Sequence, residues 1–478
     1  MRIAVLPLAR ATFDVPYAEE MARSALAALD HAGIAVVGSR RLLFDAAAAG
    51  EALAALADER VDLVLVLQVT FTDASMTVRI AQTVRAPLAI WAFPEPRAGG
   101  RLRLNAFCGL NLALHALGRA GQRARWLYLA PNAPDAGAAL RGLAEAAGAA
   151  PPMLKEFSEP QQQLSGPGPR AAASPSADGK AEAILASLSG RRIGLLGEHP
   201  VGFDTCRYDA GQLKRLVGIE VEGIPLTRLF DDARALDEDQ VVGARRAVEP
   251  AIAGLETVDQ EQLGRSLRLF RALEALVADK GLAGLAVRCW PETFTEYGCA
   301  VCGPMGLVTG EGTPCACEAD VLGALTAMLL QEAAGEPGWL VDIVDMDAAG
   351  DSAVFWHCGS APLAMADETT PPRAQIHSNR RMPLLAEFTL KPGRITVARL
   401  SQARNELRLV LAGADVVRAP MSFTGTSGVV RFDRPARSVM ASLLDEALEH
   451  HVAFAYGEHR DVLRAVAGRL GLPVLELA

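Results

Sequence analysis

An apolar run near the start of the chain, residues 61–69 (VDLVLVLQV), constrains the fold most strongly. A strand has an almost continuous apolar sequence when both faces of its sheet are covered, as in parallel sheets that carry helices on both sides. Strand-like segments at 2–8, 33–37, 87–93 and 125–129 alternate with helical segments at 18–32 and 46–58. This alternation predicts an open parallel sheet in an N-terminal α/β domain, residues 1–165.

A change in composition follows this first domain. Residues 159–180 are rich in Pro, Gly, Ser and Gln, and we predict a linker or exposed loop at 166–180. Strand-like and helical segments then alternate again, from 192–197 to two strands at 339–345 and 352–357, which predicts a second α/β domain over 181–360.

The pattern of apolar and turn-forming residues changes again from about residue 384. Short strand-like segments are separated by turn signals at 391–393 (KPG) and 413–415 (GAD), and they predict a small antiparallel β unit within a C-terminal domain, residues 361–478. A helix near 439–450 and a final helix–strand pair are expected to close the chain.

Charge and hydropathy exclude several classes of protein. The chain has 47 Lys and Arg against 56 Asp and Glu, a net charge of −9, and this acidic balance argues against a nucleic-acid partner. The apolar stretches are too short to span a membrane. The first residues lack a small-residue cleavage site, so they are interpreted as a strand rather than a signal peptide. We therefore expect a soluble cytoplasmic protein with reduced thiols.

Five cysteines are concentrated between residues 289 and 317. Cys299, Cys302, Cys315 and Cys317 have spacings at which four thiolates can close a tetrahedral zinc site. Free cysteines are also common as small buried side chains, and ordinary packing is the favoured interpretation.

Carboxylates and histidines follow in the next part of the chain. Glu318 precedes an apolar helix, Asp342 lies inside a strand, His357 ends the next strand, and the pair His450-His451 ends a later helix. Each has an ordinary structural explanation. Together, on strand ends and helix termini of an α/β sheet, they are a ligand set that suits Mn²⁺ or Mg²⁺.

The order of these residues resembles the L-fucose isomerase and L-arabinose isomerase superfamily. Short stretches that agree with it are 12–14 (TFD), 91–95 (WAFPE), 108–109 (CG), 197–206 (GEHPVGFDTC), 285–290 (LAVRCW), 357–362 (HCGSAP) and 390–396 (LKPGRIT). The resemblance therefore extends from near residue 5 to near residue 470. Each stretch is short, and their order and joint occurrence carry the specificity.

The resemblance implies a metal-dependent aldose–ketose isomerase that acts on a free or modified sugar through a cis-enediolate. Asp342 lies 24 residues after Glu318, as in fucose isomerases, and both are implied as metal ligands and as acid/base groups. His451 is implied as a ligand in preference to His450. His357 occupies the place of a further ligand in arabinose isomerases, and it is either a ligand or a supporting residue.

The resemblance also implies the cofactor and the assembly. The expected cation is Mn²⁺, with Mg²⁺ or Co²⁺ possible, and the expected fold is two Rossmann-like domains followed by a domain with a small antiparallel β-barrel. The partners implied are a small-molecule sugar and further copies of the chain in a homotrimer or homohexamer, with no membrane or nucleic acid.

Alternatives remain open at this point. One is a catalytically silent sugar-binding or regulatory protein of the same fold, because fold does not fix function. A dinucleotide oxidoreductase is weaker, because no G-x-G-x-x-G motif follows the first strand. Five polar or aromatic residues of the first domain either face a neighbouring subunit's site or serve as helix caps and loop residues. They are Arg10, Asp14, Phe71, Asp73 and Glu95.

Overall fold

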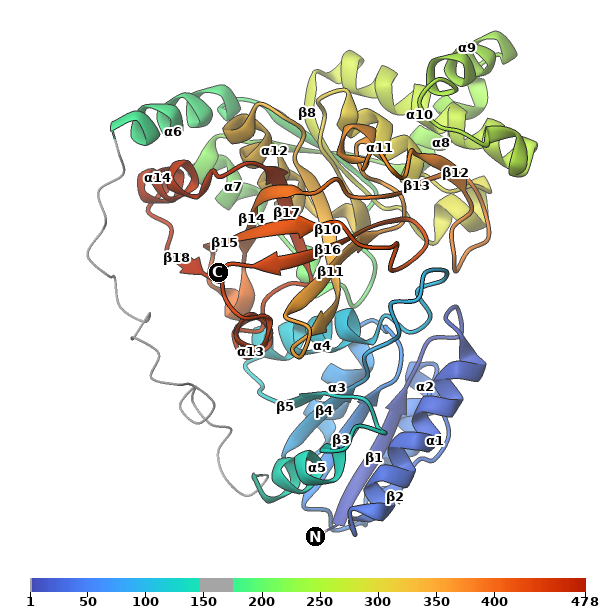
Figure 1. Ribbon diagram of the computed structural model, residues 1–478, viewed down its shortest axis with the longest axis vertical. Helices are drawn as coiled ribbons and strands as arrows, with labels where there is room; N and C mark the ends of the chain where they lie inside the picture. The colour runs from blue at the N-terminus through green and yellow to red at the C-terminus, as the bar shows by residue number, and fades with distance from the viewer. Residues whose placement is uncertain (1, 147–174) are drawn as a thin grey trace.

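The computed structural model of the protein describes residues 2–146 and 175–478, which form an α/β structure with two parallel sheets and a large mixed sheet (Figure 1). Of the predicted linker at 166–180, residues 166–174 lie outside the described residues. Its last six residues begin helix α6 (Pro175–Leu188).

The first sheet is fully parallel, with strand order β2-β1-β3-β4-β5. Every residue of β3 is buried, as the apolar run predicts. Helices α1 and α5 pack together, while α3 contacts both α2 and α4. The strands are β1 (Arg2–Leu8), β2 (Ala35–Gly38), β3 (Leu63–Gln68), β4 (Leu88–Ala92) and β5 (Arg125–Tyr128). The helices are α1 (Val15–His31), α2 (Ala46–Ala54), α3 (Ser75–Thr83), α4 (Ala106–Arg119) and α5 (Ala136–Glu145).

The second sheet is also parallel, with strand order β7-β6-β8-β9. Its strands are β6 (Arg192–Leu196), β7 (Glu220–Ile224), β8 (Leu282–Val287) and β9 (Cys315–Ala316). The helices of this region are α7 (Ala210–Val217), α8 (Leu226–Ala235), α9 (Glu238–Val248), α10 (Gln260–Lys280), α11 (Cys302–Gly310) and α12 (Val321–Ala334). Helix α12 contacts β8 on one side and strands of the third sheet on the other. It is therefore buried along almost its whole length.

The third sheet contains a closed antiparallel ring of six strands. Its order is β12-β13-β16-β11-β10-β17-β14-β15-β18, and a further pairing between β15 and β16 closes the ring. The ring strands are β10 (Trp339–Asp347), β11 (Ser352–His357), β14 (Gly393–Ser401), β15 (Arg408–Val417), β16 (Thr426–Phe432) and β17 (His451–Tyr456). Outside the ring lie β12 (Arg373–Gln375), β13 (Leu385–Thr389) and β18 (Val474–Glu476), while helices α13 (Ala436–Asp445) and α14 (Arg460–Leu470) follow β16 and β17.

Two details of this sheet differ from the sequence-based expectation. Strands β10 and β11, expected to belong with the second α/β region, pair with β17 and β16 of the ring instead. The turn expected at 413–415 is absent, because these residues lie inside β15 and pair along β14. The first difference determines where the candidate site lies, because Asp342 is on β10 and His357 is on β11.

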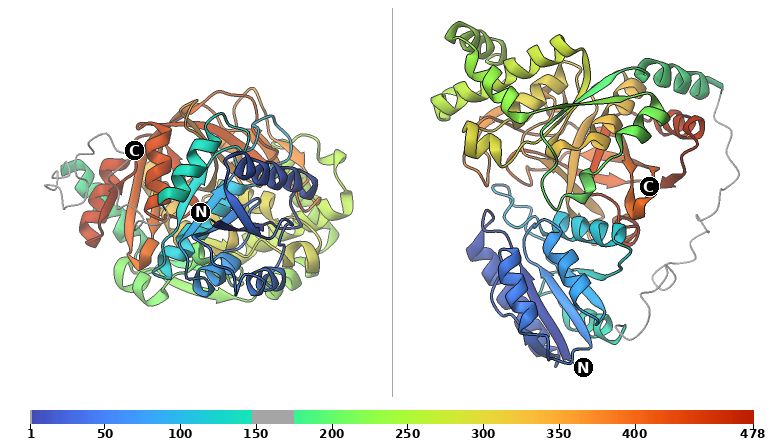
Figure 2. Two further views of the ribbon diagram at one scale, coloured as in Figure 1. Left: turned by 90° about the horizontal axis from the view of Figure 1, so that it is seen from below. Right: turned by 180° about the vertical axis from the view of Figure 1, so that it is seen from behind.

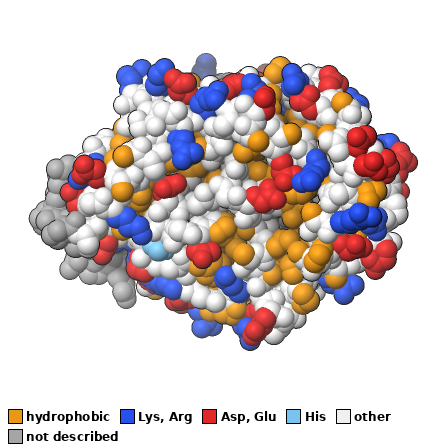
Figure 3. Space-filling model, turned by 90° about the horizontal axis from the view of Figure 1, so that it is seen from above, with side chains coloured by type: hydrophobic (Ala, Val, Ile, Leu, Met, Phe, Trp, Pro, Cys, Tyr) orange, Lys and Arg blue, Asp and Glu red, His pale blue; other side chains and the backbone are white. Residues whose placement is uncertain are grey.

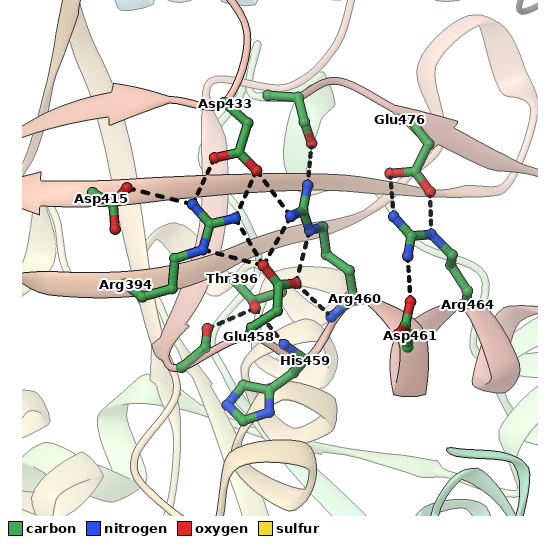
Figure 4. A network of polar contacts seen from close by, with 12 residues as sticks. Arg394, Thr396, Asp415, Asp433, Glu458, His459, Arg460, Asp461, Arg464 and Glu476 are labelled. Atoms are coloured by element: carbon green, nitrogen blue, oxygen red, sulfur yellow. Dashed lines mark hydrogen bonds and ion pairs between the residues drawn. The ribbon is translucent and has the colours of Figure 1, made fainter. Parts of the chain in front are cut away.

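One end of the ring carries a network of ion pairs, drawn in Figure 4. Arg394 of β14 binds both carboxylate oxygens of Asp433 at 2.6 Å and reaches Glu458 at 2.7 Å. Arg460, at the start of α14, binds the same two acids, each at 2.8 Å. Isolated surface pairs contribute little stability, but a shared network of this kind ties the ends of β14, β16 and β17 to α14.

The first sheet and the ring are joined through α4, which lies against β10 (Figures 1 and 2). The Cys108 thiol donates to the Ile343 carbonyl at 3.3 Å, and the Trp126 indole donates to Asp445 at 2.8 Å. Arg97 binds Asp345 of β10 at 2.6 Å. These contacts bring the loops after β1 and β3 close to the ring.

The surface agrees with the composition. Figure 3 shows acidic and basic side chains interspersed over one face, with hydrophobic side chains between them. Among the described helices, none combines the length and the apolar character needed to cross a membrane.

A buried ion pair connects the second sheet's helix α12 to the ring. Arg399 of β14 donates to both carboxylate oxygens of Asp320, at 2.6 and 3.2 Å, and Arg399 is 1% exposed. Asp320 is the N-cap of α12, where its carboxylate accepts the Gly323 amide at 2.8 Å. Both charges are therefore satisfied only by each other and by nearby buried groups.

We expect Arg399→Met to lower the free energy of unfolding by about 3–5 kcal/mol, because it leaves the Asp320 carboxylate buried without its counter-charge. Urea titration followed by circular dichroism measures the change. Arg418→Met is the matched control: Arg418 pairs with Asp367 at 3.0 Å, but its side chain is 55% exposed. That control is expected to change the free energy by less than about 1 kcal/mol. Equal effects of the two substitutions would contradict the prediction.

Candidate metal centre

Four buried side chains meet where the second sheet's carboxyl edge faces the ring. Glu318 lies in the turn between β9 and α12, with a left-handed backbone (φ 58°). Asp342 of β10 is directly opposite His451, the first residue of β17. Glu318 Oε2 and Asp342 Oδ1 each lie 3.3 Å from His451 Nε2. His357, the last residue of β11, completes the group, since one of its ring nitrogens, a carboxylate oxygen of Asp342 and a ring nitrogen of His451 all lie within 4.8 Å of one another.

The atoms that converge have no hydrogen-bond partners. Four atoms of the site are buried and have no hydrogen-bond partner among the described residues: Glu318 Oε2, Asp342 Oδ1, His357 Nε2 and His451 Nε2. Burial of polar atoms without partners is costly, and native structures rarely leave several together. Two carboxylate oxygens and an imidazole nitrogen are a donor set that suits a divalent cation such as Mn²⁺ or Mg²⁺.

His451 has the orientation expected of a ligand. Its Nδ1 lies 2.8 Å from Asp320 Oδ2, so the ring proton on Nδ1 is donated to that carboxylate. Although burial raises the pKa of Asp320, the charge of Arg399 and the bond to His451 hold it well below its usual range. The Asp320 carboxylate therefore stays ionised and directs the Nε2 atom of His451 toward Glu318 and Asp342, as carboxylates behind metal-binding histidines do.

His357 has the opposite hydrogen-bonding pattern. Its Nδ1 accepts the backbone N–H of Cys358 at 3.0 Å. Burial, together with the neighbouring imidazoles of His451 and His377, lowers the pKa of His357 to about 3, so the ring is neutral. A neutral imidazole that accepts at Nδ1 carries its proton on Nε2, and this N–H points into the site.

The two carboxylates differ in their surroundings. Glu318 Oε1 accepts a hydrogen bond from the Trp290 indole at 2.9 Å. Burial raises the pKa of Asp342 to about 7; the charge of His451 opposes this shift, while the charges of Glu318 and Asp320 add to it. Asp342 can therefore exchange a proton near neutral pH.

A cavity of about 90 Å³ adjoins these side chains. Its walls come from all three sheets, because loops after β1, β3 and β8 and the segment between β12 and β13 meet over the ring. Residues along its wall are Arg10, Thr12, Phe13, Phe71, Asn105, Trp290, Phe294, Trp356, His377 and Arg380.

The other candidates from the first domain have varied roles. Arg10 and Phe71 line this chain's own cavity, and Asp73 binds Arg10 at 3.0 Å. Asp14 caps α1 by accepting the Tyr17 amide at 3.2 Å. Glu95 accepts three successive backbone amides, from residues 103 to 105, and so fixes that loop.

The histidine pair lies at the start of a strand rather than at the end of a helix. Helix α13 ends at Asp445, five residues before His450. His450 Nε2 is 3.9 Å from Asp342 Oδ1 and 4.0 Å from Glu318 Oε2, so it is farther from both carboxylates than His451 is. Glu318 precedes α12, as expected, and Asp320 is the residue that caps this helix.

The four cysteines of the zinc hypothesis do not come together in the described structure. Cys302 instead lies near Cys358 and His377, and Cys315 donates to the Thr313 carbonyl at 3.3 Å. All eight cysteines are free, and most are buried.

Sequence reasoning missed three residues of the site. Asp320 carries a signal, since an Asp directly before an apolar helix is a typical N-cap. Arg399 and Trp290 carry none, because a single Arg in a strand or a single Trp after one does not indicate its partner.

Comparison with known proteins agrees with this geometry. The family described as "Fucose/sulfoquinovose isomerase, N-terminal domain" matches residues 4–149. The sulfoquinovose isomerase of Alkalicoccus urumqiensis is 28% identical over 417 residues, 87% of this chain and 86% of that protein. Those of Priestia megaterium and Clostridium sp. (strain MSTE9) are 26% and 27% identical, and each match covers 98% of both chains. The chain is thus similar to sulfoquinovose isomerases over nearly its whole length, and its N-terminal part matches a fucose/sulfoquinovose isomerase family.

Proposed function

We propose that the protein is a metal-dependent aldose–ketose isomerase and that its substrate is sulfoquinovose, the sugar in the names of its relatives. The observation that carries the proposal is the convergence of unpartnered buried atoms of Glu318, Asp342, His357 and His451 beside a cavity. Glu318, Asp342 and His451 would hold the cation, with Mn²⁺ first and Mg²⁺ or Co²⁺ as alternatives. A homotrimer or homohexamer stays a prediction from the resemblance.

The reaction moves a hydrogen from C2 of the aldose to C1 of the ketose. When bound, the cation would supply the positive charge that favours negative oxygens at C1 and C2. The residues of the chain must remove one proton from carbon, return it to the neighbouring carbon, and move a proton between the two oxygens.

Glu318 and Asp342 are the groups placed for this proton transfer. Each has one oxygen 3.3 Å from His451 Nε2, so a sugar bound beside this atom would lie next to both carboxylates. Burial raises the pKa of Asp342 to about 7 without a cation, and a bound cation would lower it and so favour the ionised, proton-accepting form of this carboxylate. The Trp290 indole keeps Glu318 oriented while the proton moves.

His357 is proposed as a hydrogen-bond donor to a sugar oxygen. The Cys358 amide occupies its Nδ1, so the proton on Nε2 is available to an oxygen at C1 or C2. Among the two roles that the sequence allows for His357, this geometry favours the supporting one.

A sugar-binding protein without chemistry is the weaker alternative. Binding alone does not call for two carboxylates and two imidazoles buried without partners, and the relatives are named as isomerases. The orienting group of Asp320 and Arg399 behind His451 also favours a working metal site.

Metal dependence gives the first test. The purified protein, incubated with sulfoquinovose, is expected to form the ketose with added Mn²⁺ and to lose this activity in EDTA, with recovery on return of Mn²⁺. Ketose formation is measured by chromatography and by exchange of the C2 hydrogen with solvent deuterium. Full activity in the metal-stripped protein would refute the metal-dependent mechanism.

Substitution of the carboxylates gives the second test. Glu318→Gln and Asp342→Asn keep the side-chain shape but remove the charge and the base. Each is expected to lower kcat by at least about 10²-fold, because positioned acid–base groups contribute about 10²–10⁴-fold. Asp347→Asn is the matched control, since Asp347 lies on the same strand but only accepts the turn amides of Ala349 and Gly350. Unchanged turnover in both site variants, with the fold intact, would overturn the assignment.

A further inference from the structure

Two arginines line the same cavity as Glu318 and Asp342. Arg10, just after β1, has its guanidinium carbon 5.1 Å from the centre of the Trp290 ring, and Arg380, between β12 and β13, has its own at 5.7 Å. The edge of the same indole donates to Glu318. Trp290 is therefore in contact with the two guanidinium groups through the face of its ring and with the Glu318 carboxylate through its edge.

The charges of the two arginines are compensated unequally. Arg10 donates to Asp73 at 3.0 Å, and this forms an ion pair. Within residues 2–146 and 175–478, no hydrogen bond or ion pair involves the Arg380 guanidinium, whose near neighbours are the rings of Trp290 and Phe294. A half-buried cation without a counter-ion is unfavourable, and the nearby guanidinium of Arg10 adds repulsion.

The surroundings confirm that this positive charge is not neutralised from within. Burial and the charge of Arg10 both lower the pKa of Arg380 from its ordinary value, which is the direction expected for a cation that lacks an anion. Burial and the charge of Arg380 lower the pKa of His377 to about 3, so this neighbour is neutral. The part of the cavity around Arg380 therefore has an excess of one positive charge.

We propose that Arg380, with Arg10 beside it, binds a singly charged anionic group at the end of the sugar remote from C1 and C2. This inference rests on the proposed function and deepens it by assigning the residues that select the substrate. One excess positive charge matches a monoanion better than a phosphate dianion. A sulfonate also offers three acceptor oxygens to guanidinium groups that approach from two sides.

The loop that carries Arg380 is held in place for this role. Backbone amides of Asn379 and Arg380 both donate to His377 Nδ1, each at 3.2 Å. The amide oxygen of Asn379 accepts from Arg101 at 2.7 Å, which fixes this loop to the first domain. Arg380 is thus presented from a braced turn rather than from a free surface.

The test compares sugars that differ only at the far end: sulfoquinovose, neutral 6-deoxyglucose, glucose 6-phosphate and glucuronate, each with Mn²⁺. The wild-type protein is expected to have its highest kcat/KM on the sulfonate. Arg380→Met is expected to lower kcat/KM for sulfoquinovose about 10- to 100-fold, mainly through KM, because it removes charge-assisted hydrogen bonds. Its kcat/KM for 6-deoxyglucose is expected to change much less, because this sugar offers no anionic group to Arg380. Arg381→Met is the matched control, because Arg381 is the next residue of the same loop and its side chain is exposed.

The outcomes separate the two proposals. If the wild-type protein converts the neutral sugar as well as the sulfonate, or prefers the phosphate or the uronate, the sulfonate site is wrong while the isomerase proposal stands. If no sugar is converted, the isomerase proposal fails. Calorimetric binding of sulfoquinovose then still tests the anion site: weaker binding by Arg380→Met than by Arg381→Met supports it, and equal binding overturns it.

Discussion

The buried carboxylate of Asp320 is the group on which the candidate site depends most. It caps α12, receives both arms of Arg399 from β14, and fixes the ring of His451 on β17. One side chain thus aligns a helix of the second sheet with two strands of the ring. Because Glu318 stands two residues before this cap, the same anchor also sets the position of a carboxylate that faces His451.

Much of the fold could be predicted from local patterns, and the pairing of strands could not. The buried run at β3 and the helical periodicities gave the α/β class because they report burial along one segment. Strands β10 and β11 were recognised as strands, but their sequence does not encode that β17 and β16 are their neighbours. Gly413 was interpreted as a turn signal. It lies inside β15, where a side chain would collide with Arg394, Asp433 and Arg460.

For the candidate site too, some features could be predicted from the sequence and others depend on how the strands pair. Glu318, Asp342 and His451 were named from residue types, order and a family resemblance, and the structure brings them together. The reason His451 faces Asp342 was not visible, since it depends on cross-strand pairing between β17 and β10. The unbalanced charge of Arg380 was also invisible. A missing partner is a property of the folded surroundings, and a sequence gives no sign of it.

Trp290 gives the cavity a fixed length. One edge of its ring is bonded to Glu318, and its face lies under the guanidinium groups of Arg10 and Arg380. Under the proposed binding mode, the indole sets the distance between the residues that contact the reacting carbons and those that bind the charged end of the sugar. A shorter aldose would contact the carboxylates and the two arginines less completely at the same time. Selection by chain length and selection by charge are thereby exerted through a single side chain.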